Sequence, residues 1–210
     1  MSKISFVYFD VGGVAIKDFS DTGKWSVMIS DALGISPKDH TLFNDLFAEY
    51  EDDICTGKIE VDALQPFIKE RFHVTLREDF SLLEYYLNHF EFNKDLWPIV
   101  EKVKQKVKVG LLTDQYLGML DGIFAKKLIP TKDWNAIIDS SVVGVRKPSP
   151  EIYEIAARKA GVPVGEILFI DNRQKNLVGA ADAGWQTYVY DSREYDKANQ
   201  ELSTFFSQNL

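Results

Sequence analysis

The sequence predicts an α/β protein built on a parallel β-sheet, and three observations lead to this prediction. Short apolar segments alternate with amphipathic helical ones along most of the 210 residues. Turn residues and helix-start signals separate these segments. A long helix-patterned stretch lies between the first apolar segment and the second. A chain of this length can bury one well-formed core together with a smaller second domain.

Five short apolar segments, each bounded by polar or glycine-containing turns, are the candidate strands. They comprise residues 4–9, 107–112, 136–139, 167–170 and 187–190. Helices are predicted between them at residues 96–106, 150–160 and 175–183. The helix at 150–160 has Ser149 as a candidate N-cap, Pro150 at its first position and Gly161 after its end. This alternation favours a Rossmann-like core formed by residues 1–16 and 93–210.

Residues 17–92 show no clear strand pattern and predict helices instead. The expected helices span residues 25–33, 37–50, 61–72 and 80–87. A crossover between two parallel strands rarely needs so many residues, so we expect a small all-helical cap domain at 17–92. The alternative is that these are ordinary crossover helices of a single domain.

Composition and charge exclude some classes of binding partner and indicate where in the cell the protein is expected. The formal net charge of −8 argues against a nucleic-acid or anionic membrane surface, since both need clustered cations. The single cysteine, Cys55, cannot form an internal disulfide, and the neighbouring acids are expected to raise its thiol pKa. No segment has the length of a signal-peptide core or a membrane span, so a cytoplasmic location is expected. The oligomeric state stays open.

Polar side chains follow four of the predicted sheet segments in order along the chain. Asp10 ends the first strand, and Thr113-Asp114 follow the second. Lys147 lies between Val145-Arg146 and Pro148, and Asp171-Asn172 follow the strand at 167–170. The carboxyl ends of parallel strands meet at one edge of a sheet, where ligands bind in open α/β folds. Each residue alone could be an ordinary turn or cap residue, but together they predict a site.

The order and spacing of these motifs resemble one known family. The chain reads Asp-x-x-Gly-Val from Asp10 and a hydrophobic residue before Thr113. It then reads Val-Gly-x-x-Lys-Pro-x-Pro-x-x-Tyr around Lys147, and Phe-Ile-Asp with downstream Asn, Ala and Gly at Asp171. In this set the sequence resembles the haloacid dehalogenase superfamily, most closely phosphatase-like members with a helical cap inserted after the first strand. The resemblance implies a Mg²⁺-dependent hydrolase of a small phosphorylated metabolite, such as a sugar phosphate.

The resemblance also implies roles for individual residues. Asp10 would attack phosphorus and form an aspartyl-phosphate, which divides one difficult displacement into two easier ones. Lys147 would hold the nucleophile and the phosphoryl oxygens together and compensate the charge that builds during transfer. The implied sets are Asp10, Thr113 and Lys147 for catalysis, Thr113, Asp114 and Lys147 for substrate binding, and Asp10, the Gly12 carbonyl and Asp171 for Mg²⁺.

Two positions depart from the pattern of the family. Gly12 stands where such phosphatases carry a second aspartate as general acid and base, a role that contributes about 10²- to 10⁴-fold to rate. Asn172 stands where a second acid is common. An alternative is therefore a catalytically impaired scaffold that binds a phosphorylated ligand or a protein. A haloacid dehalogenase is less favoured, since such enzymes have a bulky aromatic residue at the position of Gly12. Candidate substrate contacts in the insertion are Asp18, Trp25, Glu49 and Tyr50.

Overall fold

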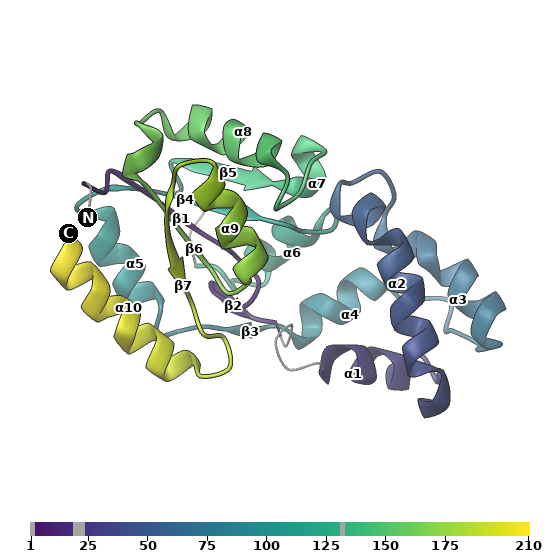
Figure 1. Cartoon of the computed structure of the whole chain (residues 1–210). Coiled ribbons are helices and arrows are strands. Elements are labelled where there is room, and N and C mark those ends of the chain that lie inside the picture. Colours follow the sequence, from purple (N-terminus) through teal and green to yellow (C-terminus); the bar gives the residue numbers. More distant parts are fainter. Residues whose placement is uncertain (1–2, 19–23, 131–132) are drawn as a thin grey trace.

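The computed structural model describes residues 3–18, 24–130 and 133–210, and it is built around a five-stranded sheet (Figure 1). The strand order is β5-β4-β1-β6-β7, and every neighbouring pair is parallel. The strands are β1 (Phe6–Phe9), β4 (Lys108–Thr113), β5 (Ala136–Asp139), β6 (Ile167–Asp171) and β7 (Gln186–Val189). The predicted α/β fold with a Rossmann-like parallel sheet is therefore confirmed, with each strand within two residues of its expected bounds.

The register of the sheet aligns the strand ends that carry the polar motifs. Phe9 of β1 is level with Leu111 of β4 and with Ile170 of β6. The N–H of Asp10 donates to the carbonyl of Ile170 at 2.9 Å, which continues this register past the end of β1. The first residue after β1 therefore lies beside the last residue of β6, Asp171.

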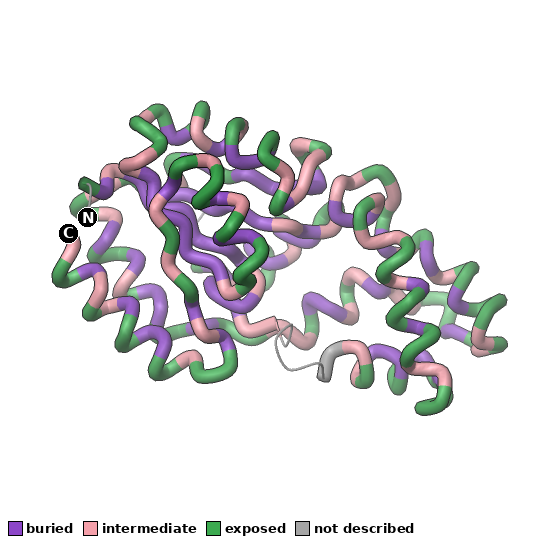
Figure 2. Tube along the Cα trace, in the orientation of Figure 1, coloured by how far each residue is buried: buried purple, intermediate pink, exposed green. Residues whose placement is uncertain are grey.

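Helices cover both faces of the sheet, and side chains alternate between the two layers as the strand period of two requires. Phe6 and Tyr8 pack with residues of α8 (Pro150–Ala160) and α9 (Gln174–Asp182). Val7 and Phe9 pack on the opposite face, with residues of α5 (Trp97–Lys104) and α10 (Tyr195–Asn209). The central strands β1, β4 and β6 are consequently buried except at Lys108, the first residue of β4 (Figure 2).

The stretch at 17–92, here called the helical insertion, is largely helical and extends to one side of the sheet (Figure 1). Its α-helices are α1 (Lys24–Ala32), α2 (His40–Cys55), α3 (Gln65–Phe72) and α4 (Leu82–His89). The expectation that it holds no strand is wrong at both ends. There, β2 (Ile16–Lys17) pairs antiparallel with β3 (Glu91–Phe92). A pair of two-residue strands is too short to produce a detectable period.

Three further helices were not expected, and two of them are short. They are α6 (Met119–Ala125), α7 (Ser140–Val143) and the long α10. Gly122 breaks the helical propensity of α6, but a Cβ there would lie 2.3 Å from a methyl carbon of Leu87, so close packing on α4 explains the glycine. The predicted helix at 150–160 is confirmed, and Gly161 adopts φ 66° after it. Ser149 occupies the N-cap position without a side-chain capping bond.

Across the described ranges, no helix combines the length and the hydropathy that a membrane span needs.

Candidate active site

The amino group of Lys147 joins the ends of three strands at the carboxyl edge of the sheet. Its Nζ lies 2.9 Å from Asp10 Oδ1 and 2.8 Å from Asp171 Oδ2, and it donates to the carbonyl of Leu112 at 3.3 Å. Lys147 is only 1% exposed. Because a buried ammonium is costly without partners, these contacts account for its burial. Burial lowers the pKa of Lys147, but the carboxylates of Asp10 and Asp171 outweigh it, so the net shift is upward and the amine stays charged.

Asp10 is held by its own strand-end turn and by Lys147. The N–H of Val11 donates to Asp10 Oδ1 at 2.8 Å. Burial raises the pKa of Asp10, Lys147 lowers it, and the negative charge of Asp171 raises it again, to about 7. The floor of the site thus holds two carboxylates and one ammonium, and carries an excess of negative charge that a further cation would relieve.

Asp171 is fully buried and accepts hydrogen bonds on both of its oxygens. The N–H of Arg173 donates to Oδ1 at 2.7 Å, and the Asn176 amide donates to Oδ2 at 2.9 Å. The backbone of Asn176 is itself held in place, since the Tyr153 hydroxyl donates to the backbone carbonyl of Asn176 at 2.7 Å. The Asn of the Phe-Ile-Asp…Asn motif therefore orients the carboxylate at the end of β6.

Thr113 and Asp114 occupy different positions at the end of β4. The Thr113 hydroxyl is buried and accepts from the Gln115 side-chain amide at 3.0 Å. The Asp114 carboxylate accepts from the N–H of Lys147 at 3.0 Å. Asp114 and Gln115 line the cavity above the sheet edge, whereas Thr113 lies beneath them. Asp114 thus fixes the backbone that carries Lys147.

A cavity of about 240 Å³ lies between the sheet edge and the helical insertion. The core side of its lining includes Asp10, Gly12, Asp114, Arg146, Lys147, Arg173 and Asn176, and the insertion contributes Asp18, Glu51, Cys55, Tyr86 and Phe90. Four of the residues predicted to do chemistry, Asp10, Gly12, Asp114 and Lys147, therefore face a space large enough for a small ligand, whereas Thr113 and Asp171 are buried and do not line it.

The substrate contacts expected from the insertion are partly wrong. Asp18 lines the cavity, but Glu49 is exposed and Tyr50 packs on Phe67 with ring centroids 5.5 Å apart. Glu51 and Cys55 are the residues of α2 that line the cavity instead. Successive residues of a helix point about 100° apart, so the sequence could not show which one would face the core. The side chain of Trp25 lies outside the described residues.

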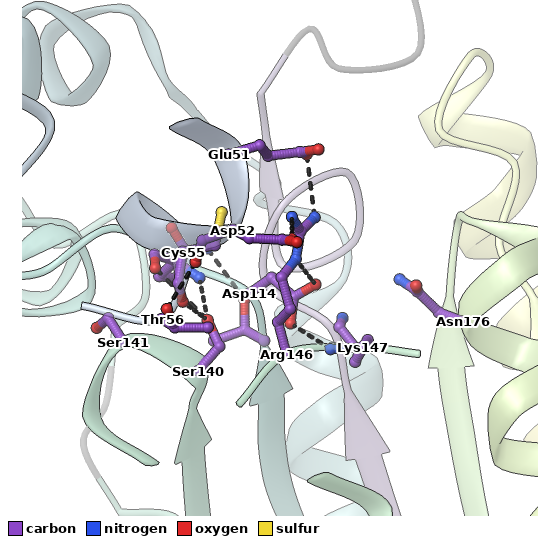
Figure 3. A network of polar contacts seen from close by, with 12 residues as sticks. Glu51, Asp52, Cys55, Thr56, Asp114, Ser140, Ser141, Arg146, Lys147 and Asn176 are labelled. Carbon is purple, nitrogen blue, oxygen red and sulfur yellow. Dashed lines mark hydrogen bonds and ion pairs between the residues drawn. The ribbon is translucent and has the colours of Figure 1, made fainter. Parts of the chain in front are cut away.

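Arg146 joins the insertion to the core, a role that the sequence analysis missed (Figure 3). Its guanidinium donates to Asp52 Oδ1 at 2.8 Å and to Glu51 Oε1 at 3.0 Å, both on α2. Its Nε lies 3.7 Å from Asp114 Oδ2. Burial raises the pKa of Glu51, but Arg146 lowers it more, so the net shift is downward and Glu51 stays ionised. The only signal in the sequence was the position of Arg146 directly before Lys147.

The turn that follows α2 also contacts the core directly. The Ser140 hydroxyl donates to the carbonyl of Cys55 at 2.6 Å (Figure 3). Gly57 adopts φ +71°, and a Cβ there would lie 2.1 Å from the carbonyl oxygen of Ser141. Burial raises the pKa of the Cys55 thiol to about 12, so the expected direction is confirmed but burial is its main cause. Cys55 is unsuited to act as a nucleophile.

Comparison with known proteins identifies related sequences and folds. The model of the haloacid dehalogenase-like hydrolase family matches residues 7–184. A phosphatase of Mycobacterium tuberculosis (strain CDC 1551 / Oshkosh) is 29% identical over 102 residues, which make up 46% of this chain and 45% of that protein. The chain therefore matches less than half the length of that relative.

Solved structures share the fold at lower sequence identity. An enzyme of the haloacid dehalogenase (HAD) family from Bacteroides thetaiotaomicron matches with a TM-score of 0.75 and 18% identity over 92% of this chain and 96% of that chain. The same enzyme in complex with magnesium and inorganic phosphate matches with a TM-score of 0.66 and 19% identity, over 91% and 96%. A predicted HAD-like hydrolase from Porphyromonas gingivalis matches with a TM-score of 0.72 and 21% identity, over 96% and 98%. The segment that matches the family model runs from β1 past α9 and contains Asp10, Lys147 and Asp171, so this chain belongs to the haloacid dehalogenase-like hydrolase family.

Proposed function

We propose that this hydrolase is a Mg²⁺-dependent phosphatase of a small phosphorylated metabolite, such as a sugar phosphate, acting through an aspartyl-phosphate on Asp10. The observation that carries the proposal is the buried Lys147 ammonium held between Asp10 and Asp171 at the floor of the cavity. A lysine placed in this way brings positive charge to the carboxylate that would attack phosphorus and to the oxygens of the transferred group. The phosphatase name of the mycobacterial relative supports the same reaction class.

The donor set of the site suits magnesium. The proposed ligands are the carboxylates of Asp10 and Asp171 and the backbone carbonyl of Gly12, all of which are oxygen donors. Burial and, to a smaller extent, the negative charge of Asp171 raise the pKa of Asp10, and a divalent cation would offset both effects. No cluster of three acidic, His or Cys side chains able to hold a metal occurs within the described ranges. When bound, Mg²⁺ would neutralise charge on the phosphoryl oxygens.

The residues of the site would have separate roles in the reaction. Asp10 attacks phosphorus, and Lys147 stabilises the charge on the phosphoryl group. The polar edge formed by Thr113, Asp114 and Gln115 positions the ligand and the Lys147 backbone. Residues 17–92 act as the cap, which limits the access of water and contacts the part of the substrate beyond the phosphate.

The test of this function is turnover of p-nitrophenyl phosphate and acetyl phosphate with Mg²⁺ by the wild type and Asp10→Asn. The amide cannot form the acyl phosphate, so we expect the rate to fall by about 10³-fold or more. Asp45→Asn, an exposed carboxylate of α2, is the matched control and should keep wild-type activity. A wild type without activity, or an Asp10→Asn variant with undiminished activity, would contradict the proposal.

The competing function is a scaffold that binds a phosphorylated ligand or a protein without turnover. Gly12 and Asn172, which replace two acids of the family pattern, are the observations that favour it. Crystals soaked with Mg²⁺ and beryllofluoride separate the two functions. An ordered adduct on Asp10 supports the enzyme, and an empty cavity supports the scaffold.

A further inference from the structure

The space that a side chain at position 12 would need is occupied by the carboxyl group of Asp18. A Cβ atom on Gly12 would lie 2.5 Å from Asp18 Oδ2 and 3.4 Å from Asp18 Cγ, and no other group comes within 4 Å of it. A larger residue at position 12 would therefore displace Asp18. Since both residues line the cavity together with Asp10, the missing side chain is replaced locally by a carboxylate from further along the chain.

The turn after β1 explains how Asp18 reaches this place. The N–H of Ile16 donates to the carbonyl of Val11 at 2.9 Å, and the N–H of Gly13 donates to the carbonyl of Ile16 at 3.0 Å. Gly13 adopts φ +75°, the left-handed conformation that such a tight turn requires. Pairing of β2 with β3 then holds the chain just before Asp18. The backbone therefore folds back over Gly12 and brings residue 18 to the catalytic edge.

Electrostatics place the Asp18 carboxylate in the same group of charges as the proposed nucleophile. Partial burial lowers the pKa of Arg173, but Asp10 and Asp18, followed by Asp171, raise it more, and the net shift is upward. Arg173 also lines the cavity. Asp18 and Asp10 thus both act on the Arg173 guanidinium that lines the cavity.

The other carboxylates that line the cavity do not approach Gly12. Glu51 binds Arg146, and Asp114 binds the backbone N–H of Lys147. Neither comes within 4 Å of the Cβ position at Gly12. Among the described acids outside the floor of the site, Asp18 is the one whose carboxyl group fills the space at Gly12.

We propose that Asp18 is the catalytic acid and base that Gly12 cannot provide, an inference that rests on the phosphatase function proposed above. In the first step an Asp10 oxygen forms a bond to phosphorus, and the bond from phosphorus to the leaving oxygen breaks. The electron pair stays on the leaving oxygen, which takes the proton of the Asp18 carboxyl group. In the second step water attacks the aspartyl-phosphate and gives its proton to the Asp18 carboxylate. The electron pair of the broken bond between phosphorus and the Asp10 oxygen returns to Asp10. The products of the two steps are an alcohol and phosphate.

The test measures the formation and decay of the phosphorylated enzyme by rapid quench, with Mg²⁺ and two leaving groups of similar size. Asp18→Asn should slow formation from phenyl phosphate by about 10²-fold or more, because its leaving group needs a proton. Formation from p-nitrophenyl phosphate, whose leaving group is already stable as an anion, should slow by less than about tenfold. Decay should slow with both substrates, so the phosphorylated enzyme should accumulate with p-nitrophenyl phosphate, from which it still forms quickly, and be visible by intact mass.

An exchange variant shows whether the effect belongs to the carboxylate rather than to folding. The double variant Gly12→Asp, Asp18→Gly should form the phosphorylated enzyme from phenyl phosphate about tenfold faster than Asp18→Asn does, or more. The control Asp45→Asn should behave as the wild type.

The outcomes separate this inference from the function on which it rests. Equal slowing with both phenyl esters, or decay as fast as in the wild type, would overturn the role of Asp18 while Asp10-dependent turnover still supports the phosphatase. A wild type that forms no phosphorylated enzyme from either ester would overturn both.

Discussion

The two sides of the cavity are built in different ways. On the core side, Asp10, Lys147 and Asp171 are almost completely buried, and the register of three parallel strands fixes where they meet. On the insertion side, Asp18 directly follows β2 and is placed by the turn after β1 and the β2–β3 pair, whereas Glu51 lies on α2 and depends on how that helix packs on the core. The parallel sheet alone therefore fixes the buried charges on the core side, whereas the side chains that face them are set by structure outside the sheet.

The connection between the two sides combines apolar packing of α4 on α6 with a few polar contacts. Arg146 binds two acids of α2, and the turn at Cys55 and Gly57 contacts α7. By contrast, apolar side chains from helices on both faces bury the central strands. We therefore expect changes in the floor of the site to cost more stability than changes in the connection to the insertion.

The largest effect on stability is expected for Lys147→Met. Removing the ammonium leaves Asp10 and Asp171 buried without their shared cation, a kind of change that costs about 3–5 kcal/mol. Urea unfolding without metal would measure the loss in the free energy of unfolding. Lys102→Met, an exposed lysine of α5, is the control and should change it by less than about 0.5 kcal/mol. Equal losses in both variants would contradict the importance of the Lys147 contacts.

A smaller and more local effect is expected for Arg146→Gln. The variant loses its ion pairs with Glu51 and Asp52, which are partly exposed and screened, so the global loss should be only about 1 kcal/mol. Hydrogen exchange should accelerate in α2 and stay unchanged in β1. Arg158→Gln, on the surface of α8, is the matched control. Unchanged exchange in α2, or equal acceleration in β1, would show that Arg146 does not hold the insertion.

The same contrast explains what the sequence could predict. Apolar strands that end in Asp10 and Asp171 are local patterns, and a parallel sheet brings their ends together whatever the loops do. The roles of Glu51 and Arg146 depend on how α2 docks on the core, which no local pattern encodes. The approach of Asp18 to Gly12 depends on a turn whose geometry is set by β2 and β3. The short α7 and the two-residue strands lack enough residues to show a period.

The central claim is that Asp10 becomes phosphorylated, and the sequence provides a direct way to test it. Tryptic cleavage after Lys3 and Lys17 releases residues 4–17, in which Asp10 is the only carboxylate side chain. Enzyme quenched in acid during turnover with Mg²⁺ and acetyl phosphate should yield this peptide with one phosphoryl group that hydroxylamine removes, as expected for an acyl phosphate. Steady turnover with this peptide unmodified, or with the phosphoryl group on another peptide, would contradict the account.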